Sequence, residues 1–596
     1  MPPSRMLVLG VAAALAACAP PSPPFPAATP AAAAGARAPQ TRAERSAYTE
    51  TSRHADVVAF LDSLQRLGAP VQLGTLGSSA EGRAIPYAVL SRPLVRSAEE
   101  ARRSGRPIVY VQGGIHAGEL EGKEALLALL RDLAVAPRPN ALDSLVLVAV
   151  PMYNVDGGER LGPQARQRPE QNGPELVGQR SNAQGLDLNR DYVKAAAPET
   201  RAALAFFSAW QPDVFVDLHA TDGSYHGYAL TYAPSLNPAA GAAGALARDA
   251  WLPELRRRMR ARHGFETFDY GNFSLQYGAD VNTDTVKDGW YSYDHRPRFG
   301  SNYYGLRGGV SILGEAFSHD PLERRVRSTY AFVREIVALA AERRAELRAL
   351  RQAPPSPPGT PLPLRSELTR TPFLADLLAE DLAEDPDSVP DEPGVPPGLR
   401  RTGRYRTLRL PVHDRFAPTL TRALPTAYVL PPAESAAVVL LRLHGVRVDT
   451  LAEPRRVRAE AFTVREAVRA PRAFQGHHEL RLEGEWRVGE ETIPAGSFWV
   501  TTAQPLGVLA AYLLEPESDD GLATWSSPVT GAPVAHGRLA RVPAAGERFP
   551  VLRMPGRATP APWTFCTVTD TAGITPSLRL QSGSKPLYAV QTPTSP

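Results

Sequence analysis

The sequence predicts an α/β fold for the first part of the chain, with a mixed, largely parallel twisted sheet flanked by helices, followed by a β-rich C-terminal domain. Continuous apolar runs, typical of strands buried on both faces, alternate with amphipathic segments. These runs are Ile108–Gln112, Leu145–Val150, Asp213–Leu218 and Val310–Glu315. After about Leu399 the pattern changes to short alternating runs, which favour strands with one exposed face.

The remaining elements of the α/β part follow from spacing. Val57, Leu61 and Leu64 share one face of a predicted helix, and residues 71–91 favour two short strands around a turn that contains glycine. A long helix is predicted over Leu322–Leu350, because its apolar residues recur at helical spacing. In the C-terminal part, Ala437–Arg442 and Phe498–Val500 are among the predicted strands.

Changes in composition divide the chain into five segments. Proline and alanine dominate one stretch near the start, and a second stretch near the middle is acidic and rich in proline, with one short helix predicted over Phe373–Ala383. The predicted segments are a signal peptide (1–17), an Ala/Pro-rich tether (18–46), the α/β domain (47–352), a Pro-rich acidic linker (353–398) and the β-rich domain (399–596).

The first residues predict an address outside the cytoplasm. Met6–Ala17 is an apolar run of 12 residues, which is too short to span a bilayer and suits a signal peptide. It ends in Leu15-Ala-Ala-Cys18, which resembles the cleavage site of a bacterial lipoprotein. We therefore expect a lipid on Cys18 that anchors the chain in a membrane, at the outer membrane and periplasm or at the cell surface. An ordinary secretory signal with an incidental cysteine is the alternative.

Charge and missing motifs exclude several functional classes. Lys and Arg total 66 and Asp and Glu total 62, so the net charge of +4 indicates no nucleic-acid partner. Two cysteines exclude a disulfide framework. The chain has no His-Glu-x-x-His zinc helix, no Gly-x-Ser-x-Gly elbow and no phosphate-binding Gly-x-x-x-x-Gly-Lys-Ser/Thr loop. Nothing in the sequence indicates the oligomeric state.

Metal-ligating side chains stand at the ends of two predicted strands. His116 and Glu119 follow the first buried strand at a spacing that lets both reach one metal ion, and His219 ends another strand. Two histidines and one glutamate leave a coordination position open, which is typical of catalytic rather than structural zinc. The sequence therefore predicts one Zn²⁺ per chain. His226 is an alternative to His219, which the strand end favours.

Charged groups that could act on a substrate accompany these ligands. Asn189 and Arg190 form a pair that could clamp a carboxylate, the arginine through two hydrogen bonds. Arg180 precedes this pair, and Glu315 is a lone acid at the end of an otherwise apolar strand. A carboxylate in that position is costly unless it is paired or functional.

In their order and spacing, these motifs resemble the zinc carboxypeptidases of the carboxypeptidase A type. The resemblance covers about residues 47–350 and includes Gly77–Arg83 and Asn154–Gly157, in which Val155 replaces the proline that is common in the family. It implies a carboxypeptidase A-like fold. It also implies that zinc activates a water molecule and that a glutamate acts as general base and acid.

The resemblance assigns roles to individual residues. It implies that the zinc ligands are His116, Glu119 and His219, with Asp187 as a partner that orients His116. Asn189 and Arg190 would hold the C-terminal carboxylate of the substrate. Arg180 would polarise the scissile carbonyl, and Glu315 would be the general base. A tyrosine often completes such sites, and the spacing favours Tyr293 over Tyr303 and Tyr304.

The predicted function is a lipid-anchored, zinc-dependent metallocarboxypeptidase that hydrolyses C-terminal peptide bonds. One alternative is an amidase that trims cell-wall peptides with the same site. Another is a non-catalytic lipoprotein that binds peptides or glycans, which the presence of Glu315 and Arg180 disfavours because a pure binder needs no base opposite a metal. The side-chain specificity and the role of the C-terminal domain are not indicated.

Overall fold

The computed structural model of the chain describes residues 38–221, 223–274, 287–371, 374–385, 399–527, 529, 539–555 and 564–566. The predicted signal peptide, Cys18 and most of the predicted tether lie outside these residues. Among the residues that are described, no helix combines the length and the apolar character needed to cross a bilayer.

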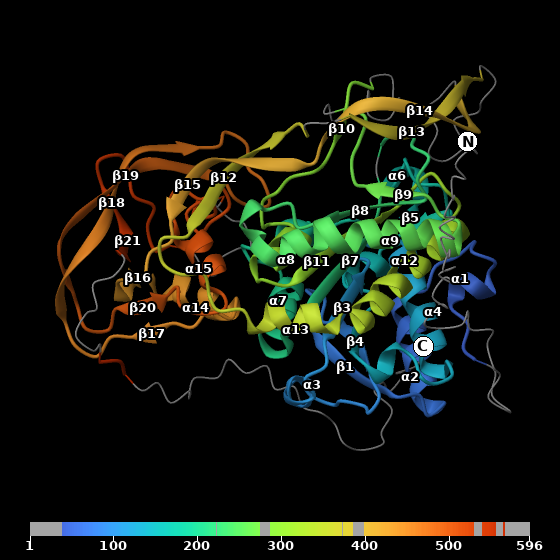
Figure 1. Ribbon diagram of the computed structural model, residues 1–596, viewed down its shortest axis with the longest axis horizontal. Helices are drawn as coiled ribbons and strands as arrows, with labels where there is room; N and C mark the ends of the chain where they lie inside the picture. Colours follow the sequence, from blue (N-terminus) through green and yellow to red (C-terminus); the bar gives the residue numbers. More distant parts are fainter. Residues whose placement is uncertain are drawn as a thin grey trace, which may run out of the picture.

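An eight-stranded mixed sheet forms the centre of the α/β domain (Figure 1), as the sequence predicts. The order is β1 (Val71–Ser78), β2 (Ala84–Leu90), β4 (Val146–Val150), β3 (Ile108–Gly113), β7 (Val214–Ala220), β11 (Val310–Ala316), β8 (Leu230–Pro234) and β9 (Thr267–Asp269). The four middle strands, β4, β3, β7 and β11, run parallel to one another. β1 pairs antiparallel with β2, β2 pairs antiparallel with β4, and β8 pairs antiparallel with β11.

Helices cover both faces of this sheet. On one face, α4 (Glu121–Val135) and α12 (Leu322–Glu342) pack against each other and against the middle strands. On the other face lie α7 (Pro198–Trp210) and α11 (Gly300–Leu306), whose Phe207 and Tyr304 rings are in edge contact at 5.2 Å. The helix predicted over Leu322–Leu350 is two helices, because the chain turns at Arg343 before α13 (Arg344–Gln352) begins. This layering buries the middle strands and leaves their carboxyl ends to build a site.

The predicted tether ends earlier than residue 46. Helix α1 (Arg42–Arg45) begins at Thr41, whose hydroxyl accepts a hydrogen bond from the backbone N–H of Glu44. Glu44 also pairs with Arg131 on α4 at 2.7 Å. These contacts attach residues 41–46 to the α/β domain.

The prediction of a linker over 353–398 is wrong for much of its length. This segment contains β12 (Pro361–Thr369) and β13 (Leu374–Glu384), and β13 replaces the short helix predicted over Phe373–Ala383. The reason is tertiary, because β13 pairs along its length with β14 (Leu399–His413) and buries Leu377 and Ala379 against the α/β domain. Figure 1 shows this hairpin lying along the α/β domain.

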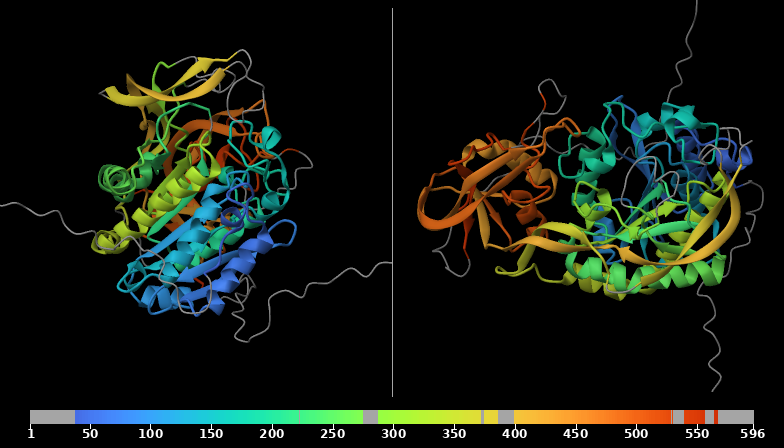
Figure 2. Two further views of the ribbon diagram at one scale, coloured as in Figure 1. Left: turned by 90° about the vertical axis from the view of Figure 1, so that its right-hand side faces the viewer. Right: turned by 90° about the horizontal axis from the view of Figure 1, so that it is seen from above.

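The C-terminal domain is β-rich, as predicted, and lies beside the α/β domain (Figure 2). Ala437–Arg442, predicted as a strand, belongs instead to helix α14 (Ser435–Leu443), and a second helix, α15 (Gly507–Leu514), follows later. The sheet is antiparallel and its order is β17 (Asp449–Thr450), β20 (Phe498–Thr501), β16 (Ala427–Leu430), β21 (Arg548–Met554), β18 (Arg455–Arg469) and β19 (Leu480–Ile493).

Candidate active site

The loop after β3 carries His116 into the site. Gly114 has a φ of +68°, a left-handed conformation that glycine adopts without strain, and the chain turns there. A β-carbon on Gly113 would lie 2.8 Å from the backbone of Gly122, so glycine is required for β3 to pass this close to α4. The two glycines thus return the chain over the start of α4 and bring His116 and Glu119 to the carboxyl edge of the sheet.

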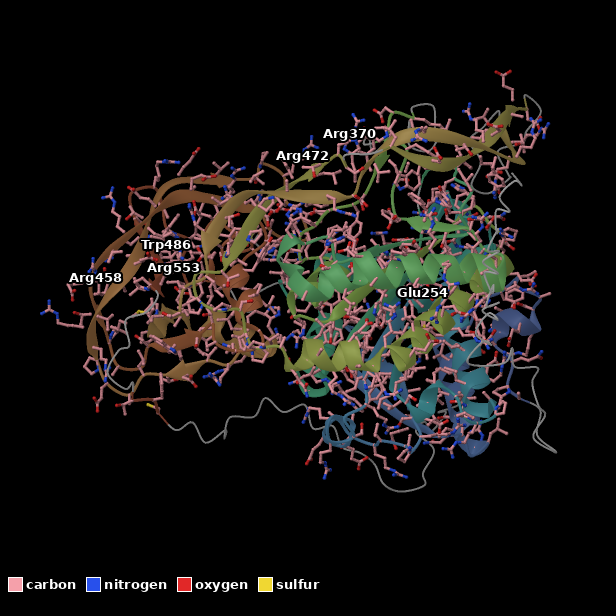
Figure 3. The ribbon with its side chains drawn as sticks, viewed as in Figure 1. Glu254, Arg370, Arg458, Arg472, Trp486 and Arg553 are labelled. Atoms are coloured by element: carbon pink, nitrogen blue, oxygen red, sulfur yellow. The ribbon has the colours of Figure 1, made fainter. Side chains whose placement is uncertain are left out.

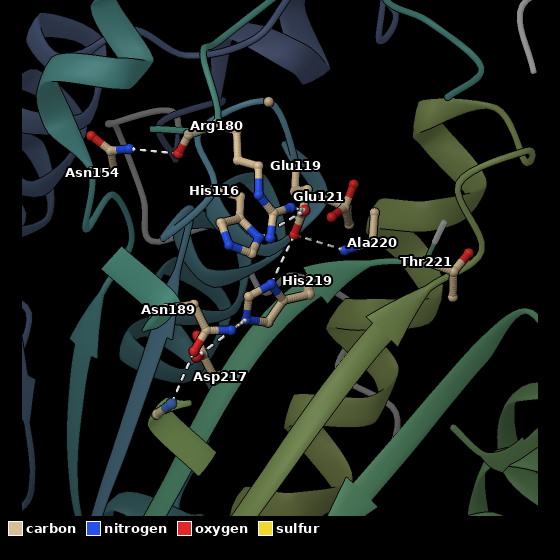
Figure 4. Close-up of polar contacts among 12 residues, drawn as sticks. His116, Glu119, Glu121, Asn154, Arg180, Asn189, Asp217, His219, Ala220 and Thr221 are labelled. Atoms are coloured by element: carbon tan, nitrogen blue, oxygen red, sulfur yellow. Dashed lines mark hydrogen bonds and ion pairs between the residues drawn. The ribbon is translucent and has the colours of Figure 1, made fainter. Parts of the chain in front are cut away.

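His116, Glu119 and His219 converge on one point (Figure 4). The Glu119 carboxylate lies between the two rings, with Oε1 2.9 Å from His116 Nδ1 and Oε2 2.9 Å from His219 Nδ1. All three side chains are buried, and one ligand atom from each lies within 4.8 Å of the others. The structure therefore brings together the three residues that the sequence indicates as metal ligands.

Each histidine is held from behind by a carboxylate. His116 Nε2 lies 3.1 Å from Asp187 Oδ1, and His219 Nε2 lies 3.2 Å from Asp217 Oδ2. A carboxylate at Nε2 favours the tautomer with the ring proton there, which would leave Nδ1 available to a metal ion beside Glu119. Asp187 thus occupies the position that the sequence prediction gives it, and Asp217 forms an ion-pair contact with the second ring.

Charge in this pocket favours a cation. Burial alone would raise the pKa of Glu119, but His116, Arg168 and His219 hold it well below its ordinary value. Burial lowers the pKa of His219, yet the carboxylates of Asp217 and Glu119 outweigh burial and raise it well above the ordinary value. Two imidazole nitrogens and a carboxylate, with further carboxylates behind them, are a donor set that suits Zn²⁺.

Comparison with known proteins identifies the family. Residues 57–297 match the family model for zinc carboxypeptidases. The α/β domain carries a zinc carboxypeptidase domain. The chain is therefore a metallopeptidase, a hydrolase with the carboxypeptidase activity of that family. Glu315 lies beyond the residues that the family model matches.

Curated relatives of this carboxypeptidase extend past the family model. Carboxypeptidase 2 of Trichophyton tonsurans is 25% identical over 495 residues, and Carboxypeptidase 2 of Trichophyton rubrum is 24% identical over 509 residues. Each match covers 80% of this chain and 81% of the relative. Since 80% of the chain is more than the α/β domain contains, both matches extend into the C-terminal part. Among solved structures, a metallo-carboxypeptidase from Burkholderia cenocepacia is 19% identical, with a TM-score of 0.36, and the match covers 49% of this chain and 70% of that chain.

Arg180 lies at the open side of the carboxypeptidase site. Its guanidinium Nη2 is 2.9 Å from Asp187 Oδ2, and Nη1 is 3.7 Å from Glu119 Oε1. The side chain is 40% exposed, whereas those of Glu119 and Asp187 are 2% and 13% exposed. Arg180 therefore presents a positive charge at the edge of the metal pocket, where a substrate can meet it.

Asn189 and Arg190 point to different partners. Asn189 Oδ1 accepts a hydrogen bond from the backbone N–H of Gly300 at 2.9 Å, and its Nδ2 lies 3.4 Å from His219 Nε2. The guanidinium carbon of Arg190 lies 3.8 Å above the centre of the Phe299 ring. The carboxamide is thus engaged within the protein, and of this pair Arg190 is the group suited to a carboxylate.

Tyr293 is the one of the three candidate tyrosines whose ring contacts Phe299, the ring on which Arg190 stacks. Its hydroxyl is 2.7 Å from Ser301 Oγ, and its ring centre is 5.3 Å from that of Phe299. Burial raises the pKa of Tyr293, and the nearby carboxylate of Glu315 adds to the rise. Tyr303 instead bonds to His444, and the Tyr304 hydroxyl donates to the Pro212 carbonyl.

Glu315 lies beside the metal pocket because of strand register. It is paired with His219 across the parallel strands β11 and β7, and it is 9% exposed. The two segments stay hydrogen-bonded just beyond this pair, because the backbone N–H of Thr221 donates to the carbonyl of Ala316. The sheet therefore holds an acid directly next to a histidine of the triad.

His226, the alternative to His219, does not join the triad. It is 1% exposed, and its ring centre lies 4.4 Å from that of Phe317. Burial is the main reason that the pKa of His226 is lowered to about 3, so the ring stays neutral.

Sequence reasoning missed Arg168. Its Nη1 lies 3.1 Å from Glu119 Oε1, and the residue is 5% exposed. Gly118 leaves room for it, because a β-carbon there would lie 2.9 Å from Arg168 Cγ. Arg168 is far from a predicted strand end and belongs to no motif, so no signal in the sequence marks it.

Proposed function

We propose that this chain is a zinc-dependent carboxypeptidase that removes single residues from the C-terminus of peptides, with one Zn²⁺ held by His116, Glu119 and His219. The observation that carries the proposal is the arrangement of three buried ligand atoms within 4.8 Å, with a carboxylate behind each imidazole. This arrangement suits a catalytic zinc with an open position. The family match favours neither a cell-wall peptide amidase nor a non-catalytic binding lipoprotein.

Glu315 is the proposed general base. Zn²⁺ bound at this site would supply Lewis-acid chemistry, by lowering the pKa of a water molecule and polarising a carbonyl. The Glu315 carboxylate, next to His219 in register, takes a proton from the attacking water and later delivers it to the leaving amine. Its position supports this role, because the carboxylate is 9% exposed and lies on the strand next to a proposed zinc ligand.

Arginines receive the negative charges of the substrate. Arg180 is partly exposed beside Glu119 and Asp187, and we assign it to the oxyanion that develops on the scissile carbonyl. Arg190, stacked on Phe299, pairs with the C-terminal carboxylate. Asn189 helps to position the site, because its carboxamide binds the Gly300 backbone and faces His219. Tyr293, whose ring packs against Phe299, is assigned to substrate contact.

The test is mass spectrometry of a mixed peptide pool incubated with the purified protein. One sample is untreated, a second is stripped with a chelator, and a third is stripped and then supplied with Zn²⁺. We expect loss of single C-terminal residues in the first and third samples only. Internal cleavage, or no cleavage by protein that holds one zinc per chain, would contradict the proposal.

We also propose that a lipid on Cys18 anchors the enzyme outside the cytoplasm, so that it meets extracytoplasmic peptides. The apolar run over Met6–Ala17 and the small residues before Cys18 support this assignment. Metabolic labelling with a radioactive fatty acid tests it. The wild-type chain should carry label and sediment with membranes, whereas Cys18→Ser should carry none. A labelled Cys18→Ser chain would show that the lipid is elsewhere.

A further inference from the structure

The hairpin between β18 and β19 ends in a tight turn at the edge of the α/β domain. The backbone N–H of Phe474 donates to the carbonyl of His477 at 2.7 Å, and the N–H of His477 donates back at 3.0 Å. Gln475 and Gly476 occupy the two central positions with φ of +50° and +77°. Positive φ at both positions is typical of a tight hairpin turn, in which glycine or asparagine is the relaxed choice at the first position. Gln475 is therefore held in a strained conformation.

The Gln475 side chain reaches the active site. Its Oε1 accepts a hydrogen bond from the backbone N–H of Asp187 at 2.9 Å, although the two residues are 288 positions apart. Asp187 is the residue whose carboxylate holds His116 Nε2 and Arg180. The same carboxylate accepts from the backbone N–H of Asn189 at 2.9 Å. One hydrogen bond from the C-terminal domain thus fixes the backbone of the residue that orients both a metal ligand and Arg180.

A second group of contacts joins the C-terminal domain to the other side of the site. Arg298 is 2% exposed and pairs with Glu479 at 2.6 Å and with Asp520 at 3.0 Å. The next residue, Phe299, is the ring on which Arg190 stacks. Both segments that carry substrate-binding groups are therefore attached to the C-terminal domain, beside which the α/β domain lies in Figure 2.

We propose that the C-terminal domain completes the active site, with Gln475 as a positioning residue that acts through Asp187 on His116 and Arg180. Its catalytic consequence rests on the proposed function. A non-glycine residue stays in the left-handed region only where surrounding contacts hold it there. Such residues are common at functional sites. The hydrogen bond to Asp187 is the contact that holds Gln475 there. Nothing in the turn itself requires glutamine, since glycine would relieve the strain.

Gln475→Gly separates positioning from stability. The substitution removes the acceptor and relaxes the backbone, so the melting temperature should stay the same or rise. Amide hydrogen exchange in the peptide that contains Asp187 should become faster. The kcat for peptide hydrolysis should fall about 3- to 10-fold with little change in KM, which is the size expected for one lost hydrogen bond. Gln475→Asn should behave the same way, because asparagine is compatible with this turn but its side chain is one methylene too short to reach the backbone N–H of Asp187.

Arg472→Ala is the matched control, since Arg472 is exposed on the same hairpin (Figure 3). It should leave exchange, melting temperature and kcat unchanged. Wild-type exchange at Asp187 in both Gln475 variants would overturn the proposal. A fall in melting temperature that accounts for the loss of activity would also overturn it, because Gln475 would then be structural. If the wild-type chain hydrolyses no peptide, the proposed function fails, and the exchange data still decide whether Gln475 holds Asp187.

Discussion

His219 and Glu315 occupy the same register position on the neighbouring parallel strands β7 and β11. Residues paired in this way lie about 5 Å apart across the sheet and point to the same face. The spacing between a proposed zinc ligand and the proposed base is therefore set by the hydrogen-bonded core of the sheet rather than by loops. A site held by rigid elements keeps its reacting groups in place between turnovers.

Replacing the proposed base should abolish turnover and leave the metal bound. For Glu315→Gln we expect kcat to fall by about 10²- to 10⁴-fold, the usual contribution of a general base. Steady-state kinetics and zinc analysis of the purified variant measure both quantities. Glu323→Gln makes the same chemical change on α12, where the side chain is 47% exposed, and should be silent. Turnover that survives in Glu315→Gln would mean that another group is the base.

Removing zinc should destabilise the folded chain. A ligand that binds only the folded state adds about 2.7 kcal/mol at a free concentration 100 times its Kd. Urea unfolding of stripped protein, with and without added Zn²⁺, measures this gain. His219→Ala should lose most of the gain, because one of three ligands is missing. His413→Ala, on the β13–β14 hairpin, should keep it. An equal response in both variants would place the metal elsewhere.

Arg190 should distinguish a free C-terminal carboxylate from a blocked one. Hydrogen bonds to charged groups contribute about 1.5–3 kcal/mol, so Arg190→Gln should raise KM for an ordinary peptide by about 10- to 100-fold. The same peptide with a C-terminal amide should be a poor substrate for both proteins and should show little difference between them. Arg166→Gln, in the exposed turn of α6 (Gln164–Gln167), is the control. An equal effect of Arg190→Gln on both peptides would assign the carboxylate to another residue.

Acid should weaken the attachment of the C-terminal domain through His444. This ring is fully buried at the end of α14, where Nδ1 accepts from the Tyr303 hydroxyl at 2.7 Å and Nε2 donates to the Val193 carbonyl at 3.2 Å. Burial lowers the pKa of His444 to about 3. The unfolded chain takes up the proton below about pH 6.5, so the stability associated with neutral His444 is full above that pH and decreases as the pH falls toward 3.

Urea unfolding at pH 7 and pH 5 measures this effect. Between these pH values, His444 alone should lower the free energy of unfolding by about 2 kcal/mol, at about 1.4 kcal/mol for each pH unit below 6.5. His444→Gln cannot take up a proton, so its stability should fall by that much less than the stability of the wild-type chain. A constant difference between the two proteins at both pH values would show that His444 does not titrate in this range.

The α/β class and the three candidate metal ligands can both be predicted from the sequence. Strands buried on both faces are nearly continuous apolar runs, so a polar residue at the end of such a run stands out and marks the edge where sites form. His116, Glu119 and His219 were visible for that reason. The resemblance to the zinc carboxypeptidases gives Asp187 as a partner of His116, and the structure has its Oδ1 3.1 Å from His116 Nε2.

Features that depend on a distant partner become visible only in the folded protein. β13 is a strand because β14 pairs with it, whereas α14 is a helix although its run of Val and Leu resembles a strand. Arg168 and Gln475 join the site from segments with no motif, 49 and 356 residues after Glu119. Local patterns report how a segment buries its own apolar face. They do not indicate which distant segment supplies the other partner of a hydrogen bond or an ion pair, because that choice is made when the domains pack together.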